Sequence, residues 1–525
     1  MMKYLLHTLL FFIASSFLFA QDVEKPQKPK KLLKNAEKYM KSGDVYSAID
    51  NYVDYVDMIE DDYVIAYRLG EAYLLARDYK NAEKTFKRIF DADPDNYRKA
   101  QYFHSICMMH TATTDIDKRY SDMEQGERET LFQEAIGKYE EAKKSLKVFS
   151  KKYRGSDKSE YKKKVKMQML GCDLAIRKLS KPEPMIKEHL DTNINRAYTD
   201  MSPLPVGKNK LIFSSMRSDT IVYVDTKDTE AEPFTAKLYV AVKEDSSWKF
   251  KGEFDNVFNE PEMYVGNGVF SRDKSRFYYS KCQENDEGRI LCDIWFSEKD
   301  SGKWQEPQAL STNVNTKKYT ETQPAIGYDP RKKREVLYFV SDREEGSRGG
   351  FDIWYTYFDK KKTNDWVTPL NCKTKINSIG NEMTPSYDME SNTMYFSSDF
   401  WPGMGGLDVF KSQGGMKRWS GKPVNIGFPL NSGADDLYYV LDQSGESGYF
   451  SSNRTGGYAL KNPTCCDDIY YFRWLNLIRV FTEGIVVDEA DETETPLRDA
   501  VVSLYLEDPE TGEEVLIKTD TTIET

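Results

Sequence analysis

The chain has 525 residues, a formal net charge of −11 and only four histidines. An acidic protein is poorly suited to general nucleic-acid binding, because neutralising phosphates requires a basic surface. The shortage of histidine leaves little material for a histidine-based metal or acid–base site. The sequence therefore predicts no catalytic residues, no metal site and no cofactor.

The first residues have the pattern of a secretory signal peptide. Lys3 precedes an apolar stretch that ends in the small residue Ala20, and this stretch is too short for a spanning helix. We therefore expect residues 1–20 to be removed and the exported chain not to span a membrane. Residues 21–34 are charged and contain proline, which predicts a flexible leader.

Residues 35–180 are expected to form an α-helical domain with an internal repeat. Small and aromatic residues recur 34 positions apart: Ala36, Tyr39, Ala48 and Tyr52 return as Gly70, Tyr73, Ala82 and Phe86. This spacing is typical of tetratricopeptide repeats, whose helix pairs stack into a curved array with a concave face. Five residues fall on the first-helix positions that line such a groove: Glu37, Lys41, Tyr67, Glu71 and Arg98. We predict that they contact a protein partner; the alternative is surface charge without a function.

Residues 184–475 change to a repeat of short strands. A strand that ends in small polar residues appears as "LIFSSMRS", "FYYSKCQ", "LYFVSDRE", "MYFSSDF" and "GYFSSNR", and its partner as "KLYVA", "CDIWF", "FDIWY", "LDVFK" and "DDIYY". Four strands in every ~55–65 residues, repeated radially, predict the blades of a β-propeller. The last blade lacks an outer strand. We expect residues 184–190 to supply it and to close a ring of five blades without free edges.

Polar residues mark the ends of these strands. The serine hydroxyls are expected to bond to loop backbone groups. Four aspartates are expected to accept backbone N–H groups where each loop re-enters its sheet: Asp293, Asp352, Asp408 and Asp468. Six further residues follow the serine strands and are expected on one rim or in the central channel: Arg217, Asp342, Arg343, Asp399, Asn453 and Arg454. Two roles remain open for them, hydrogen bonding between blades and contact with a ligand.

Seven cysteines in an exported chain predict disulfide bonds, although an odd number leaves at least one unpaired. Cys282 and Cys292 flank a loop between two predicted strands, and a bridge is predicted there. A ring between the adjacent Cys465 and Cys466 would strain the backbone. The cysteines outside the predicted bridge are therefore expected to be structural or buried.

Residues 479–525 have a sequence pattern that differs from both the helical repeats and the strand repeats. The strand-turn-strand pattern of "GIVVD" and "PLRDAVVSL" is similar to the start of a small β-sandwich of the carboxypeptidase-regulatory type. Only about 47 residues are present, against ~80–100 for such a sandwich, so the chain is expected to stop inside this domain. The predicted fold class is thus multidomain: a helical repeat array, an all-β propeller and an incomplete sandwich.

The strand repeats resemble the WD40-like repeats called PD40, found in TolB-type propellers. Signal peptide, tetratricopeptides, propeller and regulatory-like sandwich, in this order, resemble the PorE-like group of OmpA-family envelope proteins, linked to type IX secretion and gliding. The resemblance implies a periplasmic protein associated with the outer membrane, with envelope proteins of a secretion or motility complex as partners. Members of that family bind peptidoglycan through a C-terminal domain, and no such domain precedes residue 525.

Two functions were weighed on these grounds. The main prediction is a non-enzymatic periplasmic scaffold, which docks protein partners through the helical repeats and the propeller. The alternative is a propeller that binds or hydrolyses a small ligand or glycan in its central funnel. Clustered carboxylates with histidines would favour the alternative, and the sequence shows no such cluster near the blade loops.

Overall fold

The computed structural model describes most of the chain, in the ranges 28–119, 123–217, 235–285, 289–475, 486–487, 496–497, 499–507 and 514–521. The predicted signal peptide lies outside these residues. The chain divides into two compact units, Met1–Leu475 and Asn476–Thr525. In the second unit, β25 (Val501–Glu507) and β26 (Glu514–Thr521) form an antiparallel pair. The sandwich expected there stays a prediction.

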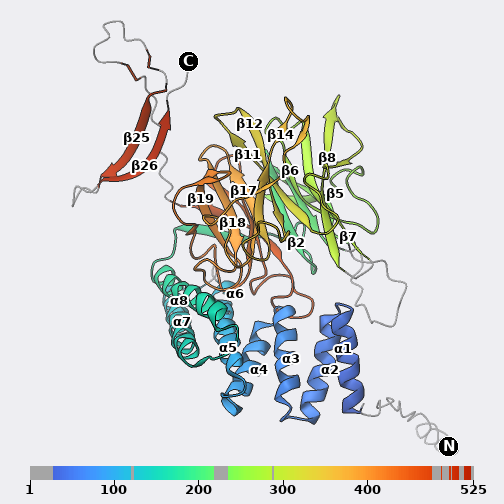
Figure 1. The fold of residues 1–525 in the computed structure, drawn as a ribbon, viewed down its shortest axis with the longest axis vertical. Coiled ribbons are helices and arrows are strands. Elements are labelled where there is room, and N and C mark those ends of the chain that lie inside the picture. Colours follow the sequence, from blue (N-terminus) through green and yellow to red (C-terminus); the bar gives the residue numbers. More distant parts are fainter. Residues whose placement is uncertain are drawn as a thin grey trace, which may run out of the picture. The chain divides into compact units, whose positions relative to one another are not determined.

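The first unit begins with helices that pack against one another in chain order (Figure 1). Their bounds are α1 (Pro29–Lys41), α2 (Val45–Met58), α3 (Tyr63–Leu75), α4 (Tyr79–Ala92), α5 (Arg98–Thr111), α6 (Thr114–Arg119), α7 (Gln125–Lys152) and α8 (Lys158–Ser180). Helix α1 starts earlier than the expected boundary at residue 35, because Pro29 provides a favourable first helical residue.

The repeated residues explain how the helices pack. Ala36, Ala48 and Ala82 are fully buried between helices. At the equivalent position in α3, a Cβ atom on Gly70 would lie 2.7 Å from the ring of Phe86 in α4. The glycine therefore lets the two helices approach closely around an aromatic ring.

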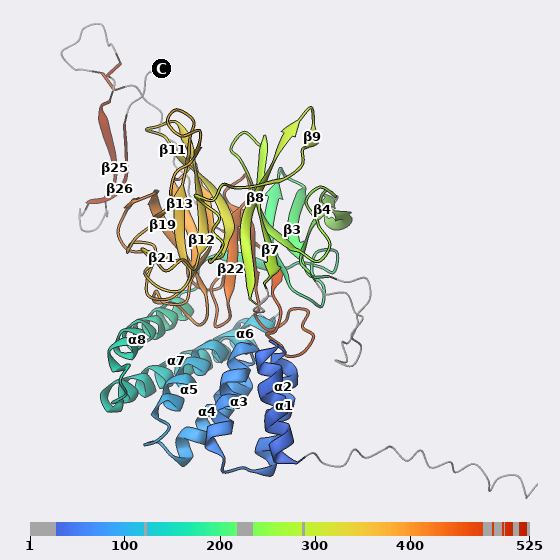
Figure 2. The same ribbon diagram turned by 45° about the vertical axis from the view of Figure 1, so that its right-hand side comes forward.

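The described strands that follow form five antiparallel sheets arranged as propeller blades (Figures 1 and 2). Blade 1 comprises β2 (Asp200–Val206), β3 (Lys210–Ser215), β4 (Lys237–Glu244) and β5 (Ser247–Glu253). Blade 2 comprises β6 (Tyr264–Phe270), β7 (Arg276–Glu284), β8 (Ile290–Asp300) and β10 (Gln308–Ala309), with β9 (Lys303–Trp304) also paired to β8.

Blade 3 comprises β11 (Glu321–Asp329), β12 (Arg334–Ser341), β13 (Asp352–Thr356) and β16 (Leu370–Asn371), and carries the hairpin β14 (Phe358–Asp359) and β15 (Asp365–Trp366). Blade 4 comprises β17 (Glu382–Asp388), β18 (Thr393–Ser398), β19 (Asp408–Gly415) and β21 (Val424–Asn425), with β20 (Arg418–Trp419). Blade 5 contains β22 (Asp436–Leu441), β23 (Ser447–Ser452) and β24 (Asp468–Trp474).

The outer strand of blade 5 comes from before blade 1. Strand β1 (Met185–His189) pairs antiparallel with β24, from Met185 opposite Trp474 to His189 opposite Tyr470. Asn195 reinforces this join, because its side chain accepts from the Ile469 amide at 2.7 Å and donates to the Ile469 carbonyl at 2.9 Å. The predicted closure of the ring by residues 184–190 is thus confirmed.

The strand-end aspartates have the predicted contacts in three blades. Asp352 accepts from the Arg348 amide at 2.6 Å, Asp408 from the Met404 amide at 2.7 Å, and Asp468 from the Tyr458 amide at 2.6 Å. Each carboxylate therefore fixes the loop that leads back into its own sheet. The loop glycines next to them leave room for this close approach; a Cβ atom on Gly403 would lie 2.1 Å from the Asp408 carboxylate.

Buried charges join the helices to the propeller within the first unit. The Asp117 carboxylate in α6 lies 3.4 Å from the Lys187 ammonium in β1 and 3.5 Å from the guanidinium of Arg454, which follows β23. The side chains of all three are at most 4% exposed. At the end of α3, the Arg77 guanidinium lies 3.2 Å from Asp435 and 3.1 Å from Asp467. The helices thus hold the loops of blades 4 and 5 through ion pairs, of which the Asp117 cluster is buried and the Arg77 pairs are partly exposed.

Candidate functional site

The same irregularity occurs in the innermost strand of every blade. The register of each strand shifts at one point, between Met201 and Leu204 in β2 and at the equivalent points of β6, β11, β17 and β22. At each shift one residue has a positive φ of 51–55°: Ser202, Asn267, Gln323, Thr384 and Tyr438. A non-glycine residue seldom adopts this conformation, at a cost of order 1–3 kcal/mol. We name these five residues the axial ring.

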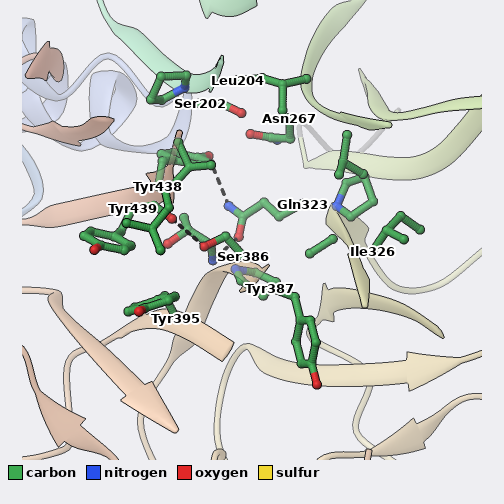
Figure 3. A pocket seen from close by; sticks show the side chains of 18 of the residues that line it. Ser202, Leu204, Asn267, Gln323, Ile326, Ser386, Tyr387, Tyr395, Tyr438 and Tyr439 are labelled. Atoms are coloured by element: carbon green, nitrogen blue, oxygen red, sulfur yellow. Dashed lines mark hydrogen bonds between the residues drawn. The ribbon is translucent and has the colours of Figure 1, made fainter. Parts of the chain in front are cut away.

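The axial ring lines a pocket of about 270 Å³ enclosed by all five blades. Figure 3 shows four of its members, Ser202, Asn267, Gln323 and Tyr438, gathered around the pocket from the surrounding strands. The Gln323 amide connects three blades, since its nitrogen donates to the Tyr438 hydroxyl at 3.2 Å and its oxygen accepts from the Thr384 backbone amide at 2.7 Å. The bulges therefore aim polar side chains into the centre of the propeller.

The pocket is rich in hydroxyl and amide groups, and its charged lining residues are acidic only. The described lining residues include no lysine, arginine or histidine. The Oδ1 atom of Asn267 is buried and has no hydrogen-bond partner among the described residues. Such an atom is costly to leave unpaired, so a donor on a ligand would stabilise the occupied pocket. Tyr387, Tyr395 and Tyr439 also belong to the lining, and the rings of Tyr387 and Tyr439 stack on Tyr338 and Phe472.

Two carboxylates line the pocket beyond the axial ring. Asp388 ends β17 and Asp442 follows β22, so they come from neighbouring blades. Asp388 accepts from the Glu390 amide at 3.0 Å, and Asp442 accepts from the Ser444 amide at 2.8 Å. Both carboxylates therefore also hold the turn that follows their strand.

The six residues predicted for the rim or channel follow the ends of the second strands, outside the axial pocket. None of them lines the axial pocket. Arg217, Arg343 and Arg454 each reach the carboxylate that begins the innermost strand of their blade: Asp200 at 2.9 Å, Glu321 at 2.8 Å, and Asp436. Arg343 and Arg454 also donate to carbonyls of the segment that enters the blade, those of Val314 at 3.0 Å and Leu430 at 2.5 Å.

The other three predicted residues have similar roles. Asp342 accepts from the Thr320 amide at 2.8 Å, and Asp399 accepts from the Asn381 amide at 2.8 Å. Asn453 accepts from the Asp435 amide at 2.8 Å. The structure therefore places all six in hydrogen bonds that fix the first strand of a blade.

The predicted groove residues gather on the helices. Glu37, Lys41 and Glu71 line a depression of about 820 Å³, and Tyr67, Glu71 and Arg98 line a second of about 690 Å³. Glu37 forms an exposed ion pair with Arg68 at 2.9 Å. The depressions are open, and the contact of these residues with a protein partner stays a prediction.

Two disulfide bonds occur among the described cysteines. The predicted bridge between Cys282 and Cys292 is present, because these residues lie directly opposite each other on β7 and β8. Cys465 and Cys466 are also bridged, so the argument that backbone strain disfavours this ring is wrong. Their loop is fixed by other contacts: Thr464 donates to the Arg77 carbonyl and Asn462 donates to the Ala76 carbonyl at 2.9 Å. Cys107, Cys172 and Cys372 are free and buried.

The axial ring was missed at the level of sequence, although a signal existed. Proline follows three of its members, in the pairs Ser202–Pro203, Gln323–Pro324 and Thr384–Pro385. Two of these pairs stand in the segments "TETQPAIGYD" and "NEMTPSYDME" that mark the first strand of a blade. Proline inside an apparent central strand indicates a bulge, which would have pointed to the residue before it.

Comparison with known proteins gives matches only at the level of structure. No protein-family model and no curated protein matches the sequence. Similar solved structures include an α-L-arabinanase from Penicillium chrysogenum complexed with arabinobiose, with 13% identity and a TM-score of 0.31 over 55% of this chain and 81% of that one. An α-L-arabinofuranosidase from Podospora anserina has 8% identity and a TM-score of 0.34, over 56% and 97% of the two chains.

A β-xylosidase/α-arabinofuranosidase from a compost metagenome has 10% identity and a TM-score of 0.34, over 54% of this chain and 94% of that one. The predictions of a non-enzymatic scaffold and of a chain that is not an enzyme are corrected here, because these similar structures are glycoside hydrolases. Similarity at this level concerns the fold alone and assigns neither a substrate nor a reaction. The resemblance to PorE-like envelope proteins, the periplasmic location and the envelope partners stay predictions. The described helices include none that is long and apolar enough to cross a membrane.

Proposed function

We propose that the propeller recognises a short, uncharged glycan in its axial pocket. The observation that carries this proposal is the axial ring, five non-glycine residues in the same rare backbone conformation around one cavity. Strain repeated at equivalent positions is typical of sites where side chains must be held in a set direction. Here it directs hydroxyl and amide groups to the centre, and these are the groups that pair with sugar hydroxyls.

The size and charge of the pocket support the same class of ligand. Its volume of about 270 Å³ is just below the range of roughly 300–1,000 Å³ that is usual for ligand sites, so a short ligand fits better than a long one. The lining has no cationic side chain, which disfavours an anion.

The test is calorimetric titration of the full chain with neutral disaccharides of arabinose, xylose, galactose and glucose. Asn267→Gly removes the unpaired oxygen while keeping a residue that tolerates positive φ. We expect it to weaken sugar binding about three- to tenfold, the effect of roughly 1 kcal/mol for one hydrogen bond. Asn364→Gly is the matched control, because Asn364 also has a positive φ of 50° but lies in an exposed turn. Equal sugar affinity in both variants, or no binding by the wild-type chain, would refute the proposal.

Hydrolysis of the glycan is a second candidate, favoured by the two carboxylates that line the pocket. Glycoside hydrolysis uses a pair of carboxyl groups, one as acid and one as base or nucleophile. Asp388 and Asp442 are the pair that the pocket offers. Release of reducing sugar that falls at least a hundredfold in both Asp388→Asn and Asp442→Asn would support this reaction. Sugar binding without release of product would exclude it and leave recognition standing.

We further propose that the helix pairs of the first unit are tetratricopeptide repeats. Three features support this: the 34-residue spacing, the small residues at helix contacts, and an aspartate before each of three successive helices. Asp44, Asp62 and Asp78 accept from the amides of Ser47, Ile65 and Asn81 at 3.0, 3.2 and 3.2 Å, respectively. Asp44 and Asp78 cap the second helices of successive pairs at equivalent positions of the repeat, and Asp62 caps α3 between them.

A further inference from the structure

A further depression, of about 540 Å³, lies between the blade 2 turn that joins β6 to β7 and the blade 3 turn that joins β11 to β12. Aromatic side chains of Tyr328, Phe358 and Trp366 contribute to its lining, and Phe358 is 40% exposed. Phe358 and Trp366 come from the β14–β15 hairpin, where their rings meet edge to face at 5.8 Å. We name this depression the turn groove.

Cationic side chains surround these aromatic residues. Arg272 and Lys333 line the turn groove and are exposed. The Arg272 guanidinium lies over the Tyr328 ring at 4.3 Å, which holds the cation in place while its N–H edges remain available. Arg331 and Lys332, beside Lys333 in the same turn, are also exposed. None of these four cations forms an ion pair with a carboxylate of the described residues.

The carboxylates near the turn groove already accept hydrogen bonds from neighbouring groups. Asp273 accepts from the hydroxyls of Ser271 and Ser275, at 2.7 Å each. Glu335 accepts from the Arg272 backbone amide at 2.5 Å and lies 3.5 Å from the Arg276 guanidinium. Asp329 accepts from the backbone amides of its own turn. The turn groove therefore keeps a surplus of positive charge, although the chain as a whole is acidic.

We propose that the turn groove binds an anionic saccharide, one that carries carboxylate or phosphate groups. Guanidinium and ammonium groups bind such anions through charge-assisted hydrogen bonds, and the exposed ring of Phe358 offers a flat apolar surface for a sugar ring. An acidic peptide would use the cations and leave the aromatic residues without a role. This site is separate from the axial pocket, whose lining has no cation, and does not depend on the function proposed there.

The experiment titrates the full chain with trigalacturonate, with a maltotriose phosphate, and with fully methyl-esterified trigalacturonate as the uncharged counterpart. We expect at least one anionic saccharide to bind, the ester to bind at least tenfold more weakly, and the affinity to fall as salt is raised. The two anionic probes distinguish carboxylate from phosphate as the group recognised. Failure of both to bind would overturn the proposal.

Variants localise the site. The double reversal Arg272→Glu with Lys333→Glu should weaken binding of the anionic saccharide at least tenfold, and Phe358→Ala should weaken it about threefold. Lys162→Glu with Lys163→Glu on α8 is the matched control, because both lysines are exposed and the change in net charge is the same. Equal weakening by the control, or equally tight binding of hexaglutamate to the wild-type chain, would refute a saccharide site in the turn groove. Asn267→Gly should leave this binding unchanged, so failure here and failure at the axial pocket are distinguishable.

Discussion

Blade 4 contains a buried carboxyl group that lacks the partner found in three other blades, and this predicts a stability that falls as pH rises. Glu382 occupies the position of Asp200, Glu321 and Asp436 at the start of the innermost strand and is fully buried. Where those blades have an arginine two residues after the last serine of the second strand, blade 4 has Phe400. Glu382 instead accepts hydrogen bonds from the Ser378 amide at 2.6 Å and the Ser398 hydroxyl at 2.8 Å.

Burial raises the pKa of Glu382 from 4.5 to about 8, and the serine hydrogen bonds oppose only part of this effect. A carboxyl whose pKa is raised on folding binds its proton more tightly in the native state. Its contribution to stability therefore falls as pH rises from about 4.5 to about 8. At 1.36 kcal/mol per pH unit, the loss between pH 5 and pH 8 is on the order of 3–4 kcal/mol, as an upper estimate.

The substitution Glu382→Gln keeps the shape and hydrogen-bonding capacity but removes the charge. We expect it to change stability little at pH 5 and to raise the free energy of unfolding by a few kcal/mol at pH 8, measured by urea unfolding at both pH values. Glu321→Gln should show a smaller dependence on pH, because burial raises the pKa of Glu321 only to about 7, and it also deprives Arg343 of its charged partner, which should destabilise the protein by about 1–3 kcal/mol. An effect of Glu382→Gln that does not vary with pH would refute the reasoning.

Two further predictions concern the helices. Asp117→Asn leaves two buried cations without their shared counter-charge and should lower the free energy of unfolding by about 3–5 kcal/mol. The control Asp115→Asn, at an exposed position of the same helix, should change the free energy of unfolding by less than about 0.5 kcal/mol. Equal effects of the two substitutions would show that the buried cluster is not stabilising. Gly70→Ala pushes a methyl group to 2.7 Å from Phe86 and should cost about 1–3 kcal/mol in a thermal or urea melt. Gly137→Ala, where nothing lies within 4 Å, should instead stabilise α7 by up to about 1 kcal/mol.

The blade count and the ring closure could be predicted because they depend on repeated local patterns. The second strands contain small polar residues toward their ends, and in three blades the third strand begins at an aspartate that fixes its loop. The missing outer strand of blade 5 left one sheet edge unpaired. The segment of β1 has a sequence similar to the outer strands of other blades and pairs with this edge. Such inferences need only the spacing of strands and the requirement that sheet edges be covered.

The site residues could not be predicted in the same way, because their roles depend on contacts between distant segments. Arg454 follows a serine strand in the same pattern as Arg217. Of these two arginines, Arg454 contacts Asp117 of α6 and Arg217 contacts Asp200 of its own blade. The positive φ of the axial ring arises from the register of the strands. Residues as different as Thr384 and Tyr438 adopt it, so residue type alone does not predict it. A sequence pattern thus located the strand ends and not the direction in which each side chain points.

The helices contact one end of the propeller, and both proposed sites include residues at the other end. Helices α3 and α6 bind the loops of blades 4 and 5 at the end where the innermost strands begin, through Arg77 and Asp117. The axial pocket includes the other ends of these strands, at Asp388 and Leu441, and the turn groove lies beyond the corresponding end of β11. Ligands would therefore approach from the end opposite the helices. The two sites differ in charge, because the axial pocket is lined by carboxylates and the turn groove by a surplus of cations. They therefore select different chemical groups. One saccharide could bind both sites only if its anionic groups lay away from the axial pocket.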